Sequence, residues 1–143
     1  VSLATFGWFA CHTVGCAYGI ETYPGEGLLW ALSRDLPNLY GIQEPRVAVQ
    51  LIAAGWSAIL LLGVLAARGK IRSRGLVFAS WLVLQSLGAF GLGFLRADDV
   101  ALVRGWRADQ VVNLCLIAAG VVAATVRMAT AGERLSDRAS DSV

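Results

Sequence analysis

Four long stretches of this chain contain no charged residue, and they restrict its fold more than any other feature of the sequence. The stretches cover residues 1–20, 47–67, 75–95 and 110–126. All twelve Lys and Arg residues and all ten Asp and Glu residues lie between or after them. A helix needs about 20 mostly apolar residues to cross the hydrocarbon core of a membrane, with a range of about 17–25. Each stretch is therefore long enough for one crossing, with the fourth at the short limit.

The composition excludes an ordinary soluble domain. Only 15% of the 143 residues are charged and 57% are apolar, whereas a soluble domain has about 25% charged residues. Too few polar residues remain to solvate a soluble helical hairpin. Because lipid offers the backbone no hydrogen-bond partner, each span is expected to be a helix. We therefore predict an all-α fold, a polytopic membrane helix bundle of about four transmembrane helices over residues 1–126.

The charges of the loops predict the orientation of the bundle. Residues 68–74 carry four positive charges and no negative one, and an excess of Lys and Arg marks a cytoplasmic loop. The loops over residues 21–46 and 96–109 mix acids with bases, so we expect them outside. The tail over residues 127–143 is then cytoplasmic, and its alternating charges and small residues predict a helix end that becomes disordered.

Three cysteines, Cys11, Cys16 and Cys115, lie in apolar stretches, and an odd number argues against a disulfide framework. Cys11 and Cys16 are five residues apart, about 140° around a helix, so they would not share a face. Cys11, His12 and Cys16 are residue types that bind metal ions, but structural zinc sites use four ligands. Buried small residues are the favoured interpretation. A redox role lacks a Cys-x-x-Cys pair, and no metal or cofactor is expected.

Polar and small residues inside the spans predict close helix packing. Polar side chains in a membrane usually face the bundle interior, and here hydrogen bonds between helices are favoured over a functional role. Pairs of small residues four apart let helix backbones approach each other. The polar residues are His12, Gln50, Gln85 and Asn113, and the small pairs are Ala89 with Gly93 and Gly120 with Ala124.

Three segments carry motifs in a fixed order. The first is Phe-Gly-Trp-Phe-Ala-Cys-His-Thr-Val-Gly-Cys-Ala-Tyr-Gly over residues 6–19, followed by Glu-Thr-Tyr-Pro. The second is Pro-Arg-Val-Ala-Val-Gln-Leu over residues 45–51. The third is Phe-Leu-Arg-Ala-Asp over residues 94–98, with Gly-Trp-Arg-Ala-Asp-Gln over residues 105–110. In order, spacing and expected topology these segments resemble the prolipoprotein diacylglyceryl transferase family.

The resemblance implies a membrane-embedded, phospholipid-dependent transferase of lipoprotein biosynthesis. Such enzymes move the diacylglyceryl group of phosphatidylglycerol onto the cysteine thiol of a lipoprotein precursor, which forms a thioether and releases glycerol phosphate. The implied partners are phosphatidylglycerol and a lipoprotein precursor, not nucleic acid, and the implied location is the bacterial inner membrane. The match covers the C-terminal half of a family member, and the chain begins with Val instead of Met. We therefore expect it to be the C-terminal part of a longer protein.

The resemblance also implies the site residues. Arg46 and Arg96 would contact the phosphate, which arginine binds through paired hydrogen bonds, and His12 would accept the proton of a thiol, with a packing histidine as the alternative. The remaining implied substrate-binding residues are Gly15 in the signature, Tyr18 and Gly19 in the head-group pocket, and Gln85 at the place of a usual tyrosine.

Two departures from the family pattern leave catalysis open. Trp8 and Ala89 stand where the family has arginines, and a cation placed at developing charge is worth about 10²–10³ in rate. A divergent or partial transferase is the leading interpretation. The alternative is a non-catalytic lipid-binding or assembly subunit on the same fold. A third hypothesis is an unrelated four-span protein whose glycines serve only packing.

Overall fold

The structure is a helix bundle with two small β-hairpins at one end. The computed structural model describes residues 2–37, 40–67 and 73–140, with side chains up to residue 130. In chain order the elements are α1 (Ser2–Val14), α2 (Leu28–Ala31), β1 (Ser33–Pro37), β2 (Gln43–Val47), α3 (Val49–Ala67), α4 (Arg74–Leu92), the 3-10 helix η1 (Gly93–Leu95), β3 (Leu102–Val103), β4 (Trp106–Arg107) and α5 (Ala108–Ser140).

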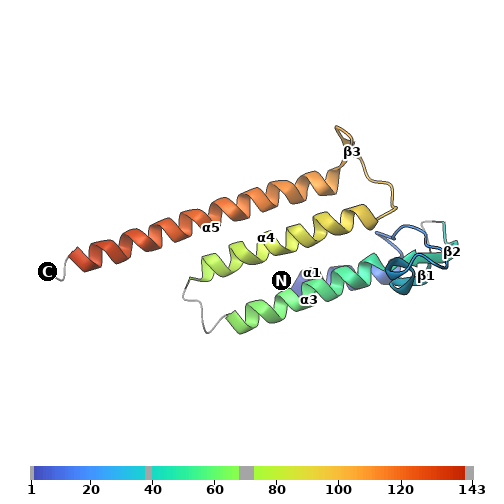
Figure 1. The fold of residues 1–143 in the computed structure, drawn as a ribbon, viewed down its shortest axis with the longest axis horizontal. Helices are drawn as coiled ribbons and strands as arrows, with labels where there is room; N and C mark the ends of the chain where they lie inside the picture. Colours follow the sequence, from blue (N-terminus) through green and yellow to red (C-terminus); the bar gives the residue numbers. More distant parts are fainter. Residues whose placement is uncertain (1, 38–39, 68–72, 141–143) are drawn as a thin grey trace.

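Three helices of the described chain are long and apolar enough to cross a membrane. They cover Val49–Ala67, Arg74–Leu95 and Ala108–Thr130, with mean hydropathies of 2.1, 1.6 and 2.0. Figure 1 shows them running side by side, with α4 between α3 and α5. The predicted fold class, a multi-pass membrane helix bundle, is thus confirmed. The tail after residue 126 continues as helix to Ser140, and residues 141–143 lie outside the described part.

The predicted count of four spans is not confirmed, because α1 has only 13 residues. The helix ends after Val14, where Gly15 adopts a left-handed φ of +76°. The Cys16 N–H then donates to the Cys11 carbonyl at 3.0 Å, which is the hydrogen bond of a Schellman C-cap. The predicted helix over residues 1–20 therefore stops short, and α1 packs against α3.

The expectation that Cys11 and Cys16 form no disulfide is wrong. The two residues are bonded to each other, with their Cα atoms 5.0 Å apart. The estimate of 140° assumed one continuous helix through both, whereas the left-handed turn at Gly15 brings Cys16 back beside Cys11. The remaining cysteine, Cys115, is a free thiol on the exposed surface of α5.

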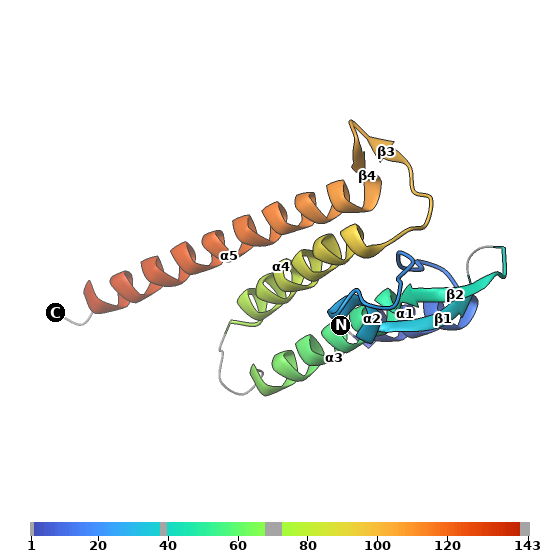
Figure 2. The same cartoon turned by 45° about the vertical axis from the view of Figure 1, so that its right-hand side comes forward.

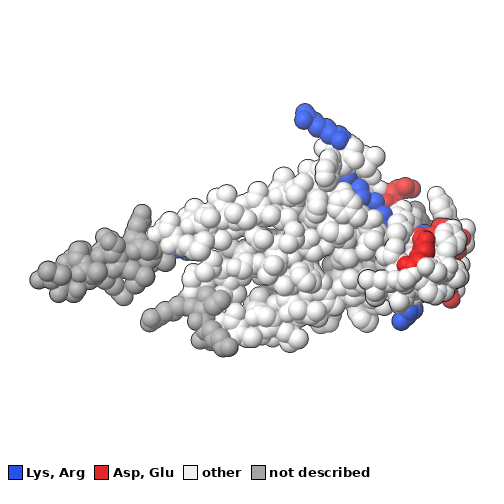
Figure 3. Space-filling view, in the orientation of Figure 1, with Lys and Arg blue, Asp and Glu red and all other residues white. Residues whose placement is uncertain are grey.

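Both hairpins lie at the end of the bundle opposite the C-terminus (Figure 2). Strands β1 and β2 pair antiparallel from Ser33 with Val47 to Pro37 with Gln43, and β3 pairs with β4. Neither hairpin was predicted. Figure 3 shows the described charged side chains of this face gathered at the hairpin end, while the flank of the helices carries almost none. Most of the basic segment used to predict the orientation, residues 68–72, lies outside the described residues.

Glycines set the distance between the helices, as predicted from the small residues. A Cβ atom on Gly88 would lie 2.2 Å from Nε1 of Trp56, and one on Gly120 would lie 2.6 Å from Cγ2 of Val83. The Trp56 indole donates to the Leu84 carbonyl at 3.2 Å. The predicted role of Gln85 between helices is also observed, since its side chain and that of Ser57 hydrogen-bond across α3 and α4.

We expect Gly88→Ala to lower the free energy of unfolding by about 1–3 kcal/mol, because overpacking a close contact has this typical cost. Thermal unfolding in maltoside micelles measures the change. Gly91→Ala is the matched control in the same helix, since a Cβ there meets nothing within 4 Å. Equal loss of stability in the two variants would show that helix packing at Gly88 is not the cause.

Candidate functional site

An extended segment at the hairpin end joins the two halves of the chain. Residues 18–22, named here the crossing segment, run between β2 and residues 95–97 at the end of η1. Each edge of the segment makes two backbone hydrogen bonds, so it acts as a middle strand. The bonds are Ile20 N–H to Leu95 O (2.9 Å) and Ala97 N–H to Tyr18 O (3.0 Å) on one edge, and Val47 N–H to Ile20 O (3.0 Å) and Thr22 N–H to Pro45 O (2.9 Å) on the other.

Gly19 allows this close approach. A Cβ atom at this position would lie 2.2 Å from the carbonyl oxygen of Val47, a contact that no side chain can make. Gly19 also pairs with Arg96 across one edge of the segment, and Glu21 pairs with Arg46 across the other. The crossing segment therefore brings Arg46 and Arg96, which are far apart in the sequence, to either side of one strand.

Arg46 lies at the centre of the first charged group. The residue is only 4% exposed, and its Nη2 contacts Glu21 at 2.5 Å and Glu44 at 2.6 Å. Its guanidinium carbon lies 5.1 Å from the centre of the Tyr18 ring, in range of a cation–π interaction, and Nη1 donates to the Gly19 carbonyl at 3.5 Å. One guanidinium faces two carboxylates, so the group has one negative charge in excess.

The second charged group joins two copies of the sequence Arg-Ala-Asp. Arg96 donates two hydrogen bonds to Asp98, two residues along, whereas Arg107 donates one to Asp109, two residues along. Each arginine also reaches the other's aspartate, so the four charges form a closed, neutral ring. The contacts are Arg96–Asp98 at 2.6 and 2.9 Å, Arg96–Asp109 at 3.1 Å, Arg107–Asp98 at 3.1 Å and Arg107–Asp109 at 3.3 Å.

The ring shifts the titration of two of its members. Burial alone would raise the pKa of Asp98, but the hydrogen bond from Arg96 and the charges of Arg96 and Arg107 outweigh it and hold that pKa below its ordinary value. The hydrogen bond to Asp98 raises the pKa of Arg96 against the opposing effect of burial, with help from the charges of Asp98 and Asp109. Both groups are therefore charged at neutral pH.

The ionisation of Asp98 should make the free energy of unfolding depend on pH below about pH 4. Because its folded pKa lies below the unfolded value of about 3.9, its contribution is complete above about pH 4 and is lost as the pH falls through the folded pKa. We expect the wild type to exceed Asp98→Asn in thermal stability at pH 7, and the gap to close below about pH 4. Asp99→Asn is the control, since exposed Asp99 should behave as wild type. A gap that does not narrow as the pH falls below about 4 would contradict this assignment.

The structure brings together four of the predicted site residues, Tyr18, Gly19, Arg46 and Arg96. Gly15 is not among them, because it ends α1 and would meet Pro37 with an added Cβ. Gln85 is also apart from the charged groups, since it is paired with a serine of α3 inside the spans. The substrate roles of Gly15 and Gln85 therefore stay predictions.

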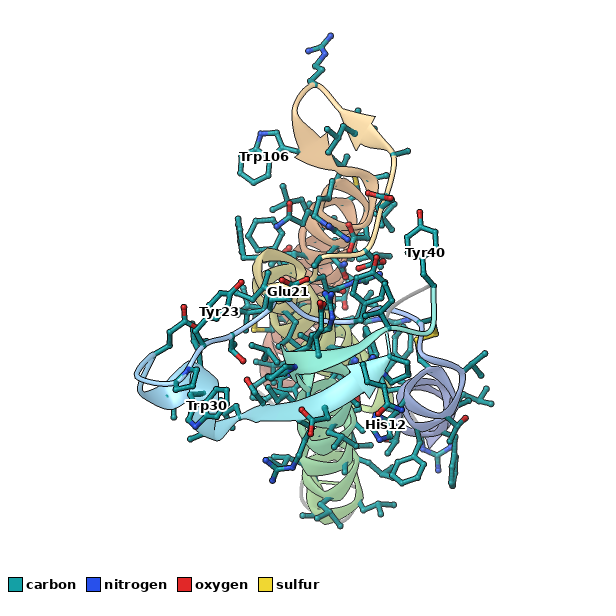
Figure 4. All side chains as sticks on the ribbon, turned by 90° about the vertical axis from the view of Figure 1, so that its right-hand side faces the viewer. His12, Glu21, Tyr23, Trp30, Tyr40 and Trp106 are labelled. Carbon is teal, nitrogen blue, oxygen red and sulfur yellow. A yellow bond between two sulfur atoms is a disulfide. The ribbon has the colours of Figure 1, made fainter. Side chains whose placement is uncertain are left out.

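His12 lies on α1, away from the two arginine groups. Figure 4 looks at the hairpin end and shows His12 and Glu21, a partner of Arg46, on different sides of the β1–β2 hairpin. The His12 side chain is half-buried, and its Nδ1 has no hydrogen-bond partner among the described residues. Its predicted role as a proton acceptor stays a prediction.

Some buried side-chain polar atoms have no hydrogen-bond partner among the described residues. In the described part of the chain these include Nε of Arg46, Oε1 of Gln50 and Nε2 of Gln110. The side-chain amide nitrogen Nε2 of Gln50 donates a hydrogen bond to the Cys16 carbonyl at 2.8 Å. The side chain of Gln110 packs against Gly93 in η1. Buried polar groups are nearly always hydrogen-bonded, so these three atoms are donors or acceptors that the described side chains leave open.

Several residues of the charged groups were not predicted from the sequence. The pairing of acids with arginines depends on how the crossing segment folds, which no local pattern reveals. One signal was available, because Arg-Ala-Asp occurs at residues 96–98 and again at 107–109. Arg107 was expected at the outer surface within reach of a phosphate, but its pairing with aspartates was missed, and so were the partners Glu21, Glu44 and Asp109.

Other features of the described residues offer no competing site. They contain no group of three or more His, Cys, Asp and Glu side chains placed to hold a metal ion. An open hollow lies beside β1, and none of the predicted site residues lines it. Its lining residues are Trp30, Ala31, Ser33, Arg34, Asp35 and Pro45.

Comparison with known proteins gives two matches. The family model described as prolipoprotein diacylglyceryl transferase matches residues 2–126. A curated relative, phosphatidylglycerol–prolipoprotein diacylglyceryl transferase 2 of Clostridium perfringens (strain 13 / Type A), is 25% identical over 117 residues, which are 82% of this chain and 44% of the relative. The chain thus spans less than half the length of that relative. No solved structure matches the chain.

Proposed function

The chain belongs to the prolipoprotein diacylglyceryl transferase family, and on this premise we propose that it binds phosphatidylglycerol and takes part in transfer of the diacylglyceryl group to a lipoprotein-precursor cysteine. The name of the relative contains both substrates. The observation that carries the proposal is the crossing segment, which gathers Gly19, Arg46 and Arg96 at the hairpin end of the membrane-crossing helices.

The proposed reaction is a displacement at carbon. The acceptor thiol gives its proton to a base, and the sulfur attacks the glyceryl carbon that bears the phosphate. The new C–S bond forms as the C–O bond breaks, and glycerol phosphate leaves with the electron pair. Negative charge develops on the leaving phosphate, so fixed arginines beside it stabilise the transition state more than the bound lipid.

The proposed orientation places the hairpin end at the outer face of the bacterial inner membrane and the tail after residue 126 in the cytoplasm. It is supported by the positive charge of the loop between α3 and α4. The site would then lie where the lipid head group meets water. His12 is the proposed proton acceptor, and the thiol would have to reach α1 for it to act.

A non-catalytic lipid-binding subunit is the second candidate, and one observation favours it. Arg46 and Arg96 both have carboxylate partners in the structure, so neither is free to hold a phosphate without an exchange of partners. The divergence at Trp8 and Ala89, where the family resemblance would place arginines, points the same way. This candidate predicts bound phosphatidylglycerol without turnover.

A transfer assay separates the two candidates. The protein, expressed with its full reading frame, is placed in phosphatidylglycerol nanodiscs with a lipobox cysteine peptide, and the mass of the peptide is then measured. We expect a diacylglyceryl mass shift that Arg96→Ala abolishes. Arg104→Asn is the control at an exposed arginine of the same loop, with Asn chosen because Arg104 has a φ of +52°. Bound lipid without any mass shift would reject the transferase and leave the lipid-binding subunit.

A further inference from the structure

Arg107 occupies a position that the family resemblance does not assign to the phosphate site. Its guanidinium and that of Arg96 contact the same two carboxylates, those of Asp98 and Asp109, at 2.6–3.3 Å. Two guanidinium groups that share carboxylate oxygens in this way point their N–H donors at a common space. Phosphate oxygens and carboxylate oxygens are bound by arginine with the same paired geometry.

The two carboxylates are not held equally. Asp98 receives two short hydrogen bonds from Arg96, at 2.6 and 2.9 Å, and another from Arg107. Asp109 receives only one from each arginine, at 3.1 and 3.3 Å. Asp109 is also the more exposed of the two, with 24% of its side chain accessible against 17%. It is therefore the carboxylate that a competing anion would displace.

The surroundings of Asp109 suit an anion. Asp109 lies in the first turn of α5, where backbone N–H groups without helical partners and the helix dipole favour negative charge. The next residue, Gln110, is 4% exposed, and its Nε2 donor has no partner among the described residues. It packs against Gly93, three residues before Arg96. Two arginines that share carboxylates at the start of α5, with a buried amide donor on the next residue, suit a ligand rich in hydrogen-bond acceptors.

We propose that Arg107 is the second arginine of the phosphate site and that Asp109 holds the phosphate position closed until a phosphodiester displaces it. The inference rests on the proposed function. The lipid phosphate takes the N–H donors of Arg96 and Arg107 that Asp109 uses in the structure, while Asp98 keeps Arg96 in place. After transfer, Asp109 competes with glycerol phosphate for the same donors and so favours its release. Asp109 is thus a positioning residue that sets the lipid affinity.

The test measures lipid affinity in Asp109→Asn. The full chain, in maltoside micelles that contain no phosphate, is titrated with short-chain phosphatidylglycerol by calorimetry. Asp109→Asn keeps the shape of the side chain but removes the competing charge, so it should bind about tenfold tighter than wild type, a gain of about 1.4 kcal/mol. Asp99→Asn is the matched control, since it removes a charge from the same loop at an exposed position without a described ion pair. A merely structural Asp109 would give equal or weaker binding, and that result overturns the proposal.

A second variant keeps the proposal testable if Asp109→Asn fails to fold. Arg107→Ala should bind phosphatidylglycerol about tenfold or more weakly, because it removes the charge-assisted hydrogen bonds that arginine makes to the phosphate. Arg104→Asn, in the turn of the same hairpin, should bind as wild type. Unchanged affinity in Arg107→Ala would overturn the role of Arg107.

Soluble anions identify the source of the phosphate. Inorganic phosphate and glycerol 3-phosphate should compete with the lipid but bind more weakly, because they lack acyl chains that the spans can contact. If inorganic phosphate binds Asp109→Asn while phosphatidylglycerol does not, the site takes a free anion and the lipid assignment is overturned. If wild type and all variants bind no phosphatidylglycerol, the proposed function itself fails. If wild type binds phosphatidylglycerol and the variants bind it with the same affinity, only the proposed exchange at Asp109 is rejected.

Discussion

Gly19→Ala is expected to abolish lipid transfer. Among the Gly→Ala variants of this chain, it should also cause the largest loss in free energy of unfolding. The new Cβ would lie 2.2 Å from the Val47 carbonyl oxygen and 3.0 Å from the Val47 Cβ. The obstacle is backbone, which cannot rotate away, so the crossing segment must leave β2. The loss of the two backbone hydrogen bonds that join this segment to β2 then adds to the typical overpacking cost of about 1–3 kcal/mol.

The measurement combines thermal unfolding in maltoside micelles with the transfer assay. Gly7→Ala is the matched control, because Gly7 lies in α1 and a Cβ there meets nothing within 4 Å. It should be as stable as wild type or up to about 1 kcal/mol more stable, since Ala favours helix over Gly. If Gly19→Ala unfolds at the same temperature as wild type, the crossing segment does not lie against β2 as described.

Arg46→Met should destabilise the hairpin end nearly as much. It leaves Glu21 and Glu44 facing each other without a cation and removes the charge above the Tyr18 ring. Breaking a buried ion pair by removing one partner costs about 3–5 kcal/mol. Here the loss should fall at the lower end of that range, because water screens carboxylates that are 46% and 41% exposed.

A triple variant distinguishes lost charge balance from lost packing. Arg46→Met combined with Glu21→Gln and Glu44→Gln removes all three charges together, so it should recover most of the stability that the single variant loses. Unfolding in maltoside micelles at pH 7 compares the two with wild type. If the triple variant is no more stable than Arg46→Met, the guanidinium acts through its packing, and the electrostatic account of this group is wrong.

The helices that cross the membrane could be predicted from the sequence because their signal is simple. Apolar runs over residues 47–67, 75–95 and 110–126 are long, uncharged and bounded by charges. The structure places α3, α4 and α5 over them. Length and polarity alone determine such spans, since lipid leaves the backbone no other way to satisfy its hydrogen bonds.

The end of α1 could not be predicted in the same way. The stretch over residues 1–20 is uncharged like the other spans, and a glycine inside it can be helical or can end a helix. The left-handed φ of Gly15, the Schellman hydrogen bond and the disulfide together stop α1 at Val14. Only tertiary structure decides this, because the crossing segment must begin at Tyr18 to reach β2 and Arg96.

The sequence predicted the arginines of the candidate site but not the carboxylates that pair with them. Arg46 and Arg96 were expected at one end of the bundle because each adjoins an outer loop, and the crossing segment does join them. The carboxylate partners follow from strand register and from the start of α5, which composition does not encode. The resemblance implied that Arg46 and Arg96 contact a phosphate. In the structure both arginines are instead paired with carboxylates.

The position of the lipid phosphate is the most direct test of this account. The protein is placed in nanodiscs with phosphatidylglycerol that carries a photoreactive group beside its phosphate, and the cross-linked peptides are mapped by mass spectrometry after illumination. We predict cross-links to the crossing segment and to residues 94–110, with fewer in Gly19→Ala and unchanged labelling in Gly7→Ala. Cross-links spread evenly around the helices, or gathered at the last turn of α3 and the first turn of α4, would contradict a phosphate site at the hairpin end.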